Sequence, residues 1–169
     1  MDWWQQIGNT VVAEFSDISD ITEMTRISLR LALAALLGGL LGYEREIKGK
    51  AAGVKTHMLV AMGSAIFVMV PAEAGVTDIE LSRIIQGIVA GIGFLGAGAI
   101  IKGNSEEHIT GLTTAAGIWL TAAIGITVGL GRETTAVLST LFTLGIFYIV
   151  PHFSKRWDKS GKQGQVQDE

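Results

Sequence analysis

Two groups of polar side chains lie beside apolar stretches, and these are the residues of this sequence that could do chemistry. The first group surrounds a polar break near residue 50 and consists of Glu44, Arg45, Glu46, Lys55, Thr56 and His57. Either glutamate could pair with Lys55, or could join His57 around a cation, because Mg²⁺ prefers carboxylate oxygens. The group lacks the ligand density of a dedicated metal cage. We therefore expect no cofactor, and Mg²⁺ coordination stays open as the alternative to ion pairing.

The second group precedes a glycine-rich stretch. It consists of Glu80, Arg83 and Gln86, and the last two share nearly one helical face. Glu80 stands three residues before Arg83 and could pair with it. Ionisable groups beside a membrane segment are costly and therefore candidates for function, although a lone Arg can also extend its charged head to the interface. Gln86 lies deeper and needs a partner.

Four glycines follow within eight residues: Gly91, Gly93, Gly96 and Gly98. Each Gly costs about 1 kcal/mol of helix propensity relative to Ala. This density favours a close crossing of two helices, with a broken helix that lines a mid-membrane site as the alternative. Thr113 and Thr114 open the next apolar stretch, where their hydroxyls could cap the helix or face a ligand. Trp119 lies near the middle of the predicted helix, and its indole N–H requires a hydrogen-bond partner.

Other chemistries are not indicated by the sequence. No nucleophile, base and acid follow a hydrolase pattern and no phosphate loop is present, so we do not expect an enzyme. The 169 residues include no cysteine, which excludes disulfides and thiol catalysis. No basic cluster with interleaved aromatic side chains supports nucleic-acid binding.

Five apolar stretches must position the two polar groups. They cover residues 27–43, 58–74, 84–101, 112–131 and 134–150. Each is near the length of about 17 to 25 residues that crosses a bilayer as a helix. No amphipathic period alternates with charge inside them, as it would in a soluble bundle. We therefore predict an all-α polytopic membrane protein whose five transmembrane helices occupy a domain of residues 26–150.

The flanking segments have a different character. In residues 1–25, apolar side chains recur at helical spacing with acids between them, and Trp3 and Trp4 suit a membrane interface. This pattern predicts an amphipathic helix over residues 3–21 on the membrane surface, serving as an anchor or as a lid or partner surface. The polar residues 151–169 are expected to form a disordered cytoplasmic tail.

The distribution of positive charge predicts the topology. Nine of the 13 Lys and Arg residues fall in the first and third breaks between the stretches and in the C-terminal tail. Lys and Arg accumulate on cytoplasmic segments. This rule places the N-terminus outside, the C-terminus in the cytoplasm and the group near residue 50 on the cytoplasmic side.

Two patterns of glycine concern the packing of the helices. Residues 38–49 match residues 92–103 at six of 12 positions, which raises two related two-helix hairpins plus a fifth helix as a hypothesis, with chance similarity as the alternative. Within the apolar stretches, the glycine pairs at four-residue spacing are Gly38/Gly42, Gly87/Gly91 and Gly125/Gly129. Such pairs let helix backbones approach closely, and they favour a tight bundle and a homo-oligomer, with a dimer first.

Four motifs occur in an order that resembles the MgtC/SapB family. They are Gly42-Tyr-Glu-Arg45, Ala52-Gly-Val-Lys-Thr-His57, Gly91-Ile-Gly-Phe-Leu-Gly-Ala-Gly98, and Gly111-Leu-Thr-Thr-Ala-Ala116 followed by Trp119 and Ala122-Ala-Ile-Gly125. Arg83 and Gln86 also occupy the places of an Arg and a Gln in that family. The resemblance covers residues 27–150.

The resemblance implies a bacterial inner-membrane protein of about five helices, linked to growth in scarce Mg²⁺, stress adaptation and virulence. It further implies a regulator of membrane partners such as the F-type ATP synthase. Longer members carry a soluble domain after the last helix, where this chain has only residues 151–169. Glu80 stands where many relatives have Asp, and Lys55 where many have Arg; both substitutions keep the charge.

Three functional hypotheses follow. The first is a non-enzymatic regulator that acts through helix–helix contact with a partner. The second is a transporter of Mg²⁺ or another cation that works as an oligomer, since five short helices make a thin pathway for one protomer. The third is a Mg²⁺ or pH sensor that uses Glu44, Glu46 and His57.

Overall fold

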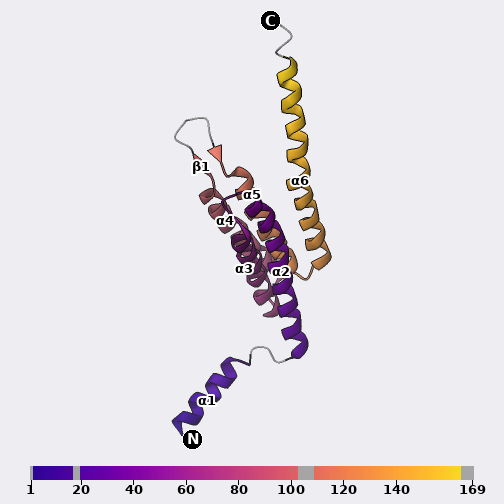
Figure 1. Cartoon of the computed structure of the whole chain (residues 1–169). Coiled ribbons are helices and arrows are strands. Elements are labelled where there is room, and N and C mark those ends of the chain that lie inside the picture. The colour runs from indigo at the N-terminus through magenta and orange to yellow at the C-terminus, as the bar shows by residue number, and fades with distance from the viewer. Residues whose placement is uncertain (1, 17–19, 103–108, 165–169) are drawn as a thin grey trace.

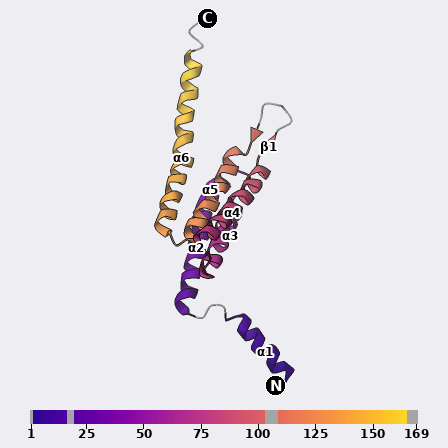
Figure 2. The same cartoon turned by 180° about the vertical axis from the view of Figure 1, so that it is seen from behind.

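The computed structural model describes residues 2–16, 20–102 and 109–164 of the chain. The helices in these ranges are α1 (Trp3–Glu14), α2 (Ile21–Ile47), α3 (Val54–Glu73), α4 (Asp78–Gly98), α5 (Leu112–Gly129) and α6 (Glu133–Gly164). Two short strands, β1 (Ile101–Lys102) and β2 (Ile109–Thr110), pair in antiparallel fashion between α4 and α5. Figure 1 shows α2 to α5 side by side, with α1 apart from them. Seen from behind, the far end of α6 also stands clear of the bundle (Figure 2).

Five of these helices, α2 to α6, are long and apolar enough to cross a membrane. The predicted all-α, five-helix membrane fold is therefore confirmed. Because successive spans alternate in direction, the bundle has two ends. We call the end with β1, β2 and the α2–α3 connection the hairpin end. We call the end with the α3–α4 and α5–α6 connections the distal end.

Helix α3 packs between α2 and α5, and glycines on both neighbours meet its backbone. A Cβ on Gly38 would lie 2.5 Å from the carbonyl oxygen of His57, and a Cβ on Gly42 would lie 2.6 Å from the Cα of Val54. On the other side of α3, a Cβ on Gly129 would lie 2.7 Å from the carbonyl oxygen of Ala65. Only glycine permits backbones to approach this closely.

The core lies along the α3 seams and consists of small and branched apolar side chains. Its buried members are Ala34, Leu37, Leu41, Ala61, Ala65, Ile124, Val128, Ala136 and Phe147. Alanines supply most of the α3 contribution, so the three helix axes can stay close. Two of the three predicted glycine pairs, on α2 and α5, therefore serve contacts within the chain.

Several helices begin or end outside the predicted apolar stretches, and α2 and α6 extend furthest beyond them. Helix α2 begins at Ile21, before the predicted stretch, because the Asp20 side chain caps it by accepting a hydrogen bond from Thr22 N at 3.1 Å. Helix α6 continues past Pro151 to Gly164, through part of the segment that was expected to be disordered. A proline removes one backbone bond of a helix, and the Lys, Arg and Gln residues beyond it favour helical backbone.

Helix α1 supports the predicted N-terminal amphipathic helix over part of its expected range. It ends at Glu14, has no buried residue and stacks the Trp3 and Trp4 rings at 4.0 Å. Residues 17–19, which fall within the predicted range of 3–21, lie outside the described residues. The hypothesis of an internal repeat stays open: Gly53 and Gly111, which follow the two matched segments, both precede helices as N-caps, but their φ angles are −103° and +91°.

Candidate functional site

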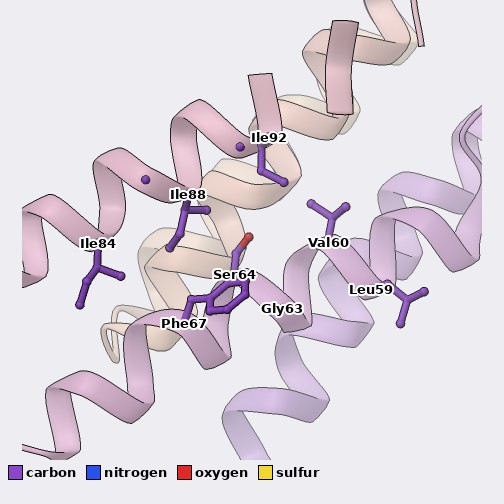
Figure 3. A pocket seen from close by; sticks show the side chains of 10 residues that line it. Leu59, Val60, Gly63, Ser64, Phe67, Ile84, Ile88 and Ile92 are labelled. Atoms are coloured by element: carbon purple, nitrogen blue, oxygen red, sulfur yellow. The ribbon is translucent and has the colours of Figure 1, made fainter. Parts of the chain in front are cut away.

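A groove of about 540 Å³ runs between α3 and α4. Figure 3 shows its two walls: Val60, Ser64 and Phe67 lie on α3, opposite Ile84 and Ile88 on α4. The lining is almost entirely apolar, and glycines on both helices, Gly63 on α3 and Gly87 and Gly91 on α4, keep it open. A site of this kind recognises an apolar chain or a helix rather than an ion.

The glycines of the groove differ from those of the core. A Cβ built on Gly63, Gly87 or Gly91 would meet nothing within 4 Å. Helix α4 as a whole is poorly covered, since 6% of its apolar stretch is buried inside the protein, against 56% for α5. The third predicted glycine pair, Gly87/Gly91, therefore borders the open groove and is not packed against another helix of this chain.

Ser64 is the polar group of the groove. It is 3% exposed, and Figure 3 shows its hydroxyl between α3 and α4. Three buried threonines, Thr121, Thr140 and Thr143, bond to their own helix, as Thr121 Oγ1 does to the Gly117 carbonyl at 2.8 Å. Among the described residues Ser64 has no hydrogen-bond partner. Because Ser64 lines the groove and its hydroxyl is free, it is suited to hydrogen-bond a group that enters there.

The structure does not form the predicted ion pair between Glu80 and Arg83. Glu80 Oε2 instead accepts hydrogen bonds from the backbone N and the hydroxyl of Thr77, both at 2.9 Å, and so closes a capping box at the start of α4. Arg83 is exposed, and no partner for it lies in the described part of the chain. Gln86 is exposed too, on the side of α4 away from Ile84 and Ile88.

The glycine-rich stretch forms a continuous helix, so the broken-helix alternative is not observed. The predicted close crossing applies to one position: Gly96 is buried, and a Cβ there would lie 3.5 Å from the Cβ of Ala115 on α5. Gly93 and Gly98 face open space instead. Glycine density in the sequence did not distinguish the single packed position from the exposed ones.

At the hairpin end, Arg45 is the buried charge. It is 4% exposed and pairs with Glu44, and its guanidinium lies 3.6 Å from the ring centre of Phe147 on α6. Glu44 also pairs with Lys48 at 3.4 Å. The cation–π contact and the ion pair stabilise the charge of Arg45, whose burial alone would be unfavourable. Arg45 therefore joins α2 to α6.

The remaining members of the group near residue 50 have separate partners. Glu46 Oε2 accepts from Val54 N at 2.8 Å and caps α3, while His57 Nδ1 donates to the Gly53 carbonyl at 2.9 Å. Neither glutamate faces His57 or pairs with Lys55, which is exposed. In the described part of the chain no three His, Asp or Glu side chains converge for a metal ion.

His57 Nε2 is the other unusual polar atom at this end. The residue is fully buried, and Nε2 has no hydrogen-bond partner in the described ranges. It lies against α5, because a Cβ on Gly117 would be 3.7 Å from it. Thr56, beside it, is half-buried.

The predicted residues at the start of α5 do not cap it. Gly111, at a φ of +91°, is the N-cap and provides no side chain. Thr114 is buried at 3% exposure, Thr113 is exposed, and neither bonds the helix end. Trp119 is 48% exposed, and its indole has no partner in the described residues.

Sequence reasoning overlooked Arg30. Its Nη1 donates to the carbonyl of Gly129 at 3.2 Å, and its Nε lies 3.5 Å from Glu133 Oε1. It therefore holds α2 against the end of α5 and the start of α6, where α5 carbonyls lack helical partners. An arginine inside an apolar stretch was the available signal. Ser64 and Phe67 were overlooked as well, and nothing in their spacing marks them as groove residues.

Fold and site together define a class: a five-helix membrane protein with an uncovered glycine-lined helix. The model of the MgtC family matches residues 31–156, and the chain belongs to this family. It is 46% identical over 129 residues to Protein SrpB of Synechococcus elongatus, covering 70% of this chain and 71% of that protein. No solved structure matches.

Two other relatives are longer. The "Putative magnesium transporter YhiD" of Escherichia coli is 44% identical over 124 residues, which cover 69% of this chain and 56% of that protein. Protein MgtC of Brucella abortus is 42% identical over 116 residues, covering 69% of this chain and 48% of that protein. The match thus spans about half the length of these two relatives.

Proposed function

We propose that this chain is a non-enzymatic regulatory membrane protein that acts by lateral contact between its α4 side and a transmembrane helix of a partner. The observation that carries this proposal is the uncovered glycine pair, Gly87 and Gly91, beside the α3–α4 groove. In lipid, association of helices depends on van der Waals packing and hydrogen bonds, because lipid tails are as apolar as the side chains. The small residues Gly87 and Gly91 allow close van der Waals packing, and the free hydroxyl of Ser64 can form a hydrogen bond.

The cellular setting follows from charge and family. We place the protein in the bacterial inner membrane, with its N-terminus outside and the hairpin end in the cytoplasm, because nine of 13 positive residues belong to that side. By family resemblance, the role is adaptation to low Mg²⁺ or stress and virulence, and the F-type ATP synthase is a candidate partner. The relative named MgtC supports membership of the family from which this role is inferred.

The test replaces the uncovered glycines. Gly87→Leu and Gly91→Leu place side chains on the groove side of α4, where a Cβ would meet nothing within 4 Å. We expect capture of membrane partners by the tagged protein to fall at least roughly tenfold, the effect of about 1.4 kcal/mol, while membrane insertion is unchanged. Ala32→Leu, at an exposed position of α2, is the matched control. Unchanged capture by both glycine variants would contradict the proposal.

A second candidate function is cation transport by an oligomer, which the name of the Escherichia coli relative favours. Its test is flux of Mg²⁺, K⁺ and H⁺ into proteoliposomes that contain the purified protein, with Arg83→Ala as the comparison. Flux that is lost in the variant at equal protein content would favour transport. Absence of flux for these three ions, together with glycine-dependent capture, would favour the regulator.

A further inference from the structure

We infer that a second copy of this chain docks on the α4 side, so that the α4 helices of two protomers cross at Gly87 and Gly91 and each enters the other's α3–α4 groove. This inference rests on the proposed function, since it names an occupant of the same surface. Three features of the chain carry it: the open space beside one of its three glycine pairs, the free hydroxyl of Ser64, and the charges at the distal end of α4.

The first feature is that the chain uses only two of its three glycine pairs. Gly38/Gly42 and Gly125/Gly129 press against the backbone of α3, whereas Gly87 and Gly91 have open space where a Cβ would be. Each glycine of the open pair is followed by isoleucine, in the sequence Gly87-Ile88 and Gly91-Ile92. Close approach at glycine, flanked by branched side chains, is how paired transmembrane helices pack.

The second feature is the floor of the groove. Ser64 is buried to 3% exposure, points between α3 and α4, and has no partner among the described residues. An acyl chain offers no hydrogen-bond acceptor, but a helix does. Where backbones meet at glycines, the carbonyls of the entering helix come within reach of a hydroxyl. A helix therefore satisfies Ser64 in a way that lipid cannot.

The third feature selects a second copy over other helices. Glu80, Arg83 and Gly87 follow one another at helical spacing along one side of α4. The Thr77 bonds to Glu80 use Oε2 only, which leaves Oε1 free, and Arg83 has no partner in the described ranges. In a two-fold symmetric dimer, a contact from residue i of the first copy to residue j of the second is repeated from residue j of the first copy to residue i of the second. Each Arg83 then faces the Glu80 of the opposite copy, so the surface is complementary in charge to itself.

The first experiment uses the cysteine-free sequence as a background. Gly87→Cys and Gly91→Cys are each placed in the full chain in membranes and oxidised. A disulfide requires Cα atoms within about 7 Å, so a crossing at these glycines should give disulfide-linked dimers. Leu36→Cys on α2 and Ile146→Cys on α6, both exposed, are the controls. We expect dimers at roughly tenfold higher yield at the two α4 positions; equal yields at all four would overturn the inference.

The second experiment tests the charge pairing between copies. Arg83→Glu alone sets like charges against each other at both pairs, and Glu80→Arg alone does the same. Each should lower the dimer fraction roughly tenfold, because two attractive pairs between the copies are replaced by two repulsive ones. When the two variants are mixed with different tags, both pairs re-form in the mixed dimer, which should recover. Mixing cannot restore the helix cap that Glu80→Arg removes, because that cap lies within one chain. Recovery in the mixed dimer would therefore report the charge pairs between the copies.

The outcomes separate this inference from the function on which it rests. Absence of α4-linked dimers and of recovery on mixing, with Gly87-dependent capture of another membrane protein intact, would overturn the second copy and leave the regulator standing. Loss of both the dimers and the capture would remove the function as well. Recovery in the mixed dimer supports the second copy at this surface.

Discussion

At the scale of single residues, glycines decide where helix backbones touch. A Cβ on Gly38 or Gly129 would press into a carbonyl group of α3, at 2.5 and 2.7 Å. The same residue type at Gly87 and Gly91 meets nothing within 4 Å. One sequence pattern therefore performs two tasks, and the neighbours of each glycine determine which.

Replacement of glycine by alanine, which adds one methyl group, distinguishes a glycine packed against a backbone from one that faces open space. Gly129→Ala should lower the free energy of unfolding by about 1–3 kcal/mol, because the extra carbon has no room against the α3 backbone. Gly93→Ala is the control: its Cβ meets no neighbour, and the better helix propensity of Ala should leave stability unchanged or raised by up to about 1 kcal/mol. Reversible unfolding in mixed micelles measures both. Equal effects of the two changes would contradict the packing described.

Arg30 should contribute to stability through the ends of two other helices. Arg30→Ala removes the hydrogen bond to the Gly129 carbonyl and the ion pair with Glu133. We expect a loss of about 1–3 kcal/mol, as is typical for a hydrogen bond to a charged group. Arg26→Ala, at an exposed position of the same helix, should change the unfolding free energy by less than about 0.5 kcal/mol. A comparable loss in both variants would show that Arg30 contributes only its charge.

The sequence indicated several polar residues as candidates for a site, but it did not indicate the groups to which they bond in the structure. Glu80 was a candidate partner for Arg83, but Thr77 lies at the N-cap and offers two donors within the same turn. His57 was a candidate cation ligand, yet its own helix supplies the Gly53 carbonyl. Local donors and acceptors are available to a side chain before tertiary contacts form. Spacing alone does not reveal this competition.

At the scale of elements, side chains satisfy free backbone groups at the starts of three helices. Asp20 caps α2, the Thr77 and Glu80 pair caps α4, and Glu46 reaches from the end of α2 to the first N–H of α3. The contact of Glu46 spans two helices, so it also fixes the turn between them.

Glu46 therefore provides a test of how α3 starts. Glu46→Ala should destabilise the protein by about 1 kcal/mol, because it removes the acceptor for Val54 N. Glu46→Gln keeps an oxygen acceptor and should retain most of that stability. Unfolding free energies of the two variants give the comparison, with Glu23→Ala in α2 as a control for lost charge. If Gln were as damaging as Ala, the charge rather than the cap would be responsible.

The five spans could be predicted from length and hydropathy because lipid requires long, apolar, fully hydrogen-bonded helices. The boundary at Ile21 could not, since polar residues continue α2 beyond its apolar part. The groove could not be predicted either. It depends on how far α4 stands from α3, and no periodicity encodes the distance between two helices.

At the scale of the whole molecule, the account fixes an orientation in the membrane. Ala74→Cys at the distal end and Lys50→Cys at the hairpin end are exposed positions in a cysteine-free chain. With a maleimide that cannot cross membranes, intact spheroplasts should label Ala74→Cys, and Lys50→Cys should react only after permeabilisation. The reverse pattern would contradict the orientation that the positive charges predict.

The central claim is that the uncovered side of α4 is where this chain meets another transmembrane helix. A photo-crosslinking scan tests it most directly: a light-activated residue is placed at each position from 86 to 94 in turn, in living cells. The account predicts crosslinked products of higher mass at 87, 91 and 94, with little at 86, 89 and 93, because a helix brings one side to its partner every 3.6 residues. Products at all positions alike, or at none, would contradict it.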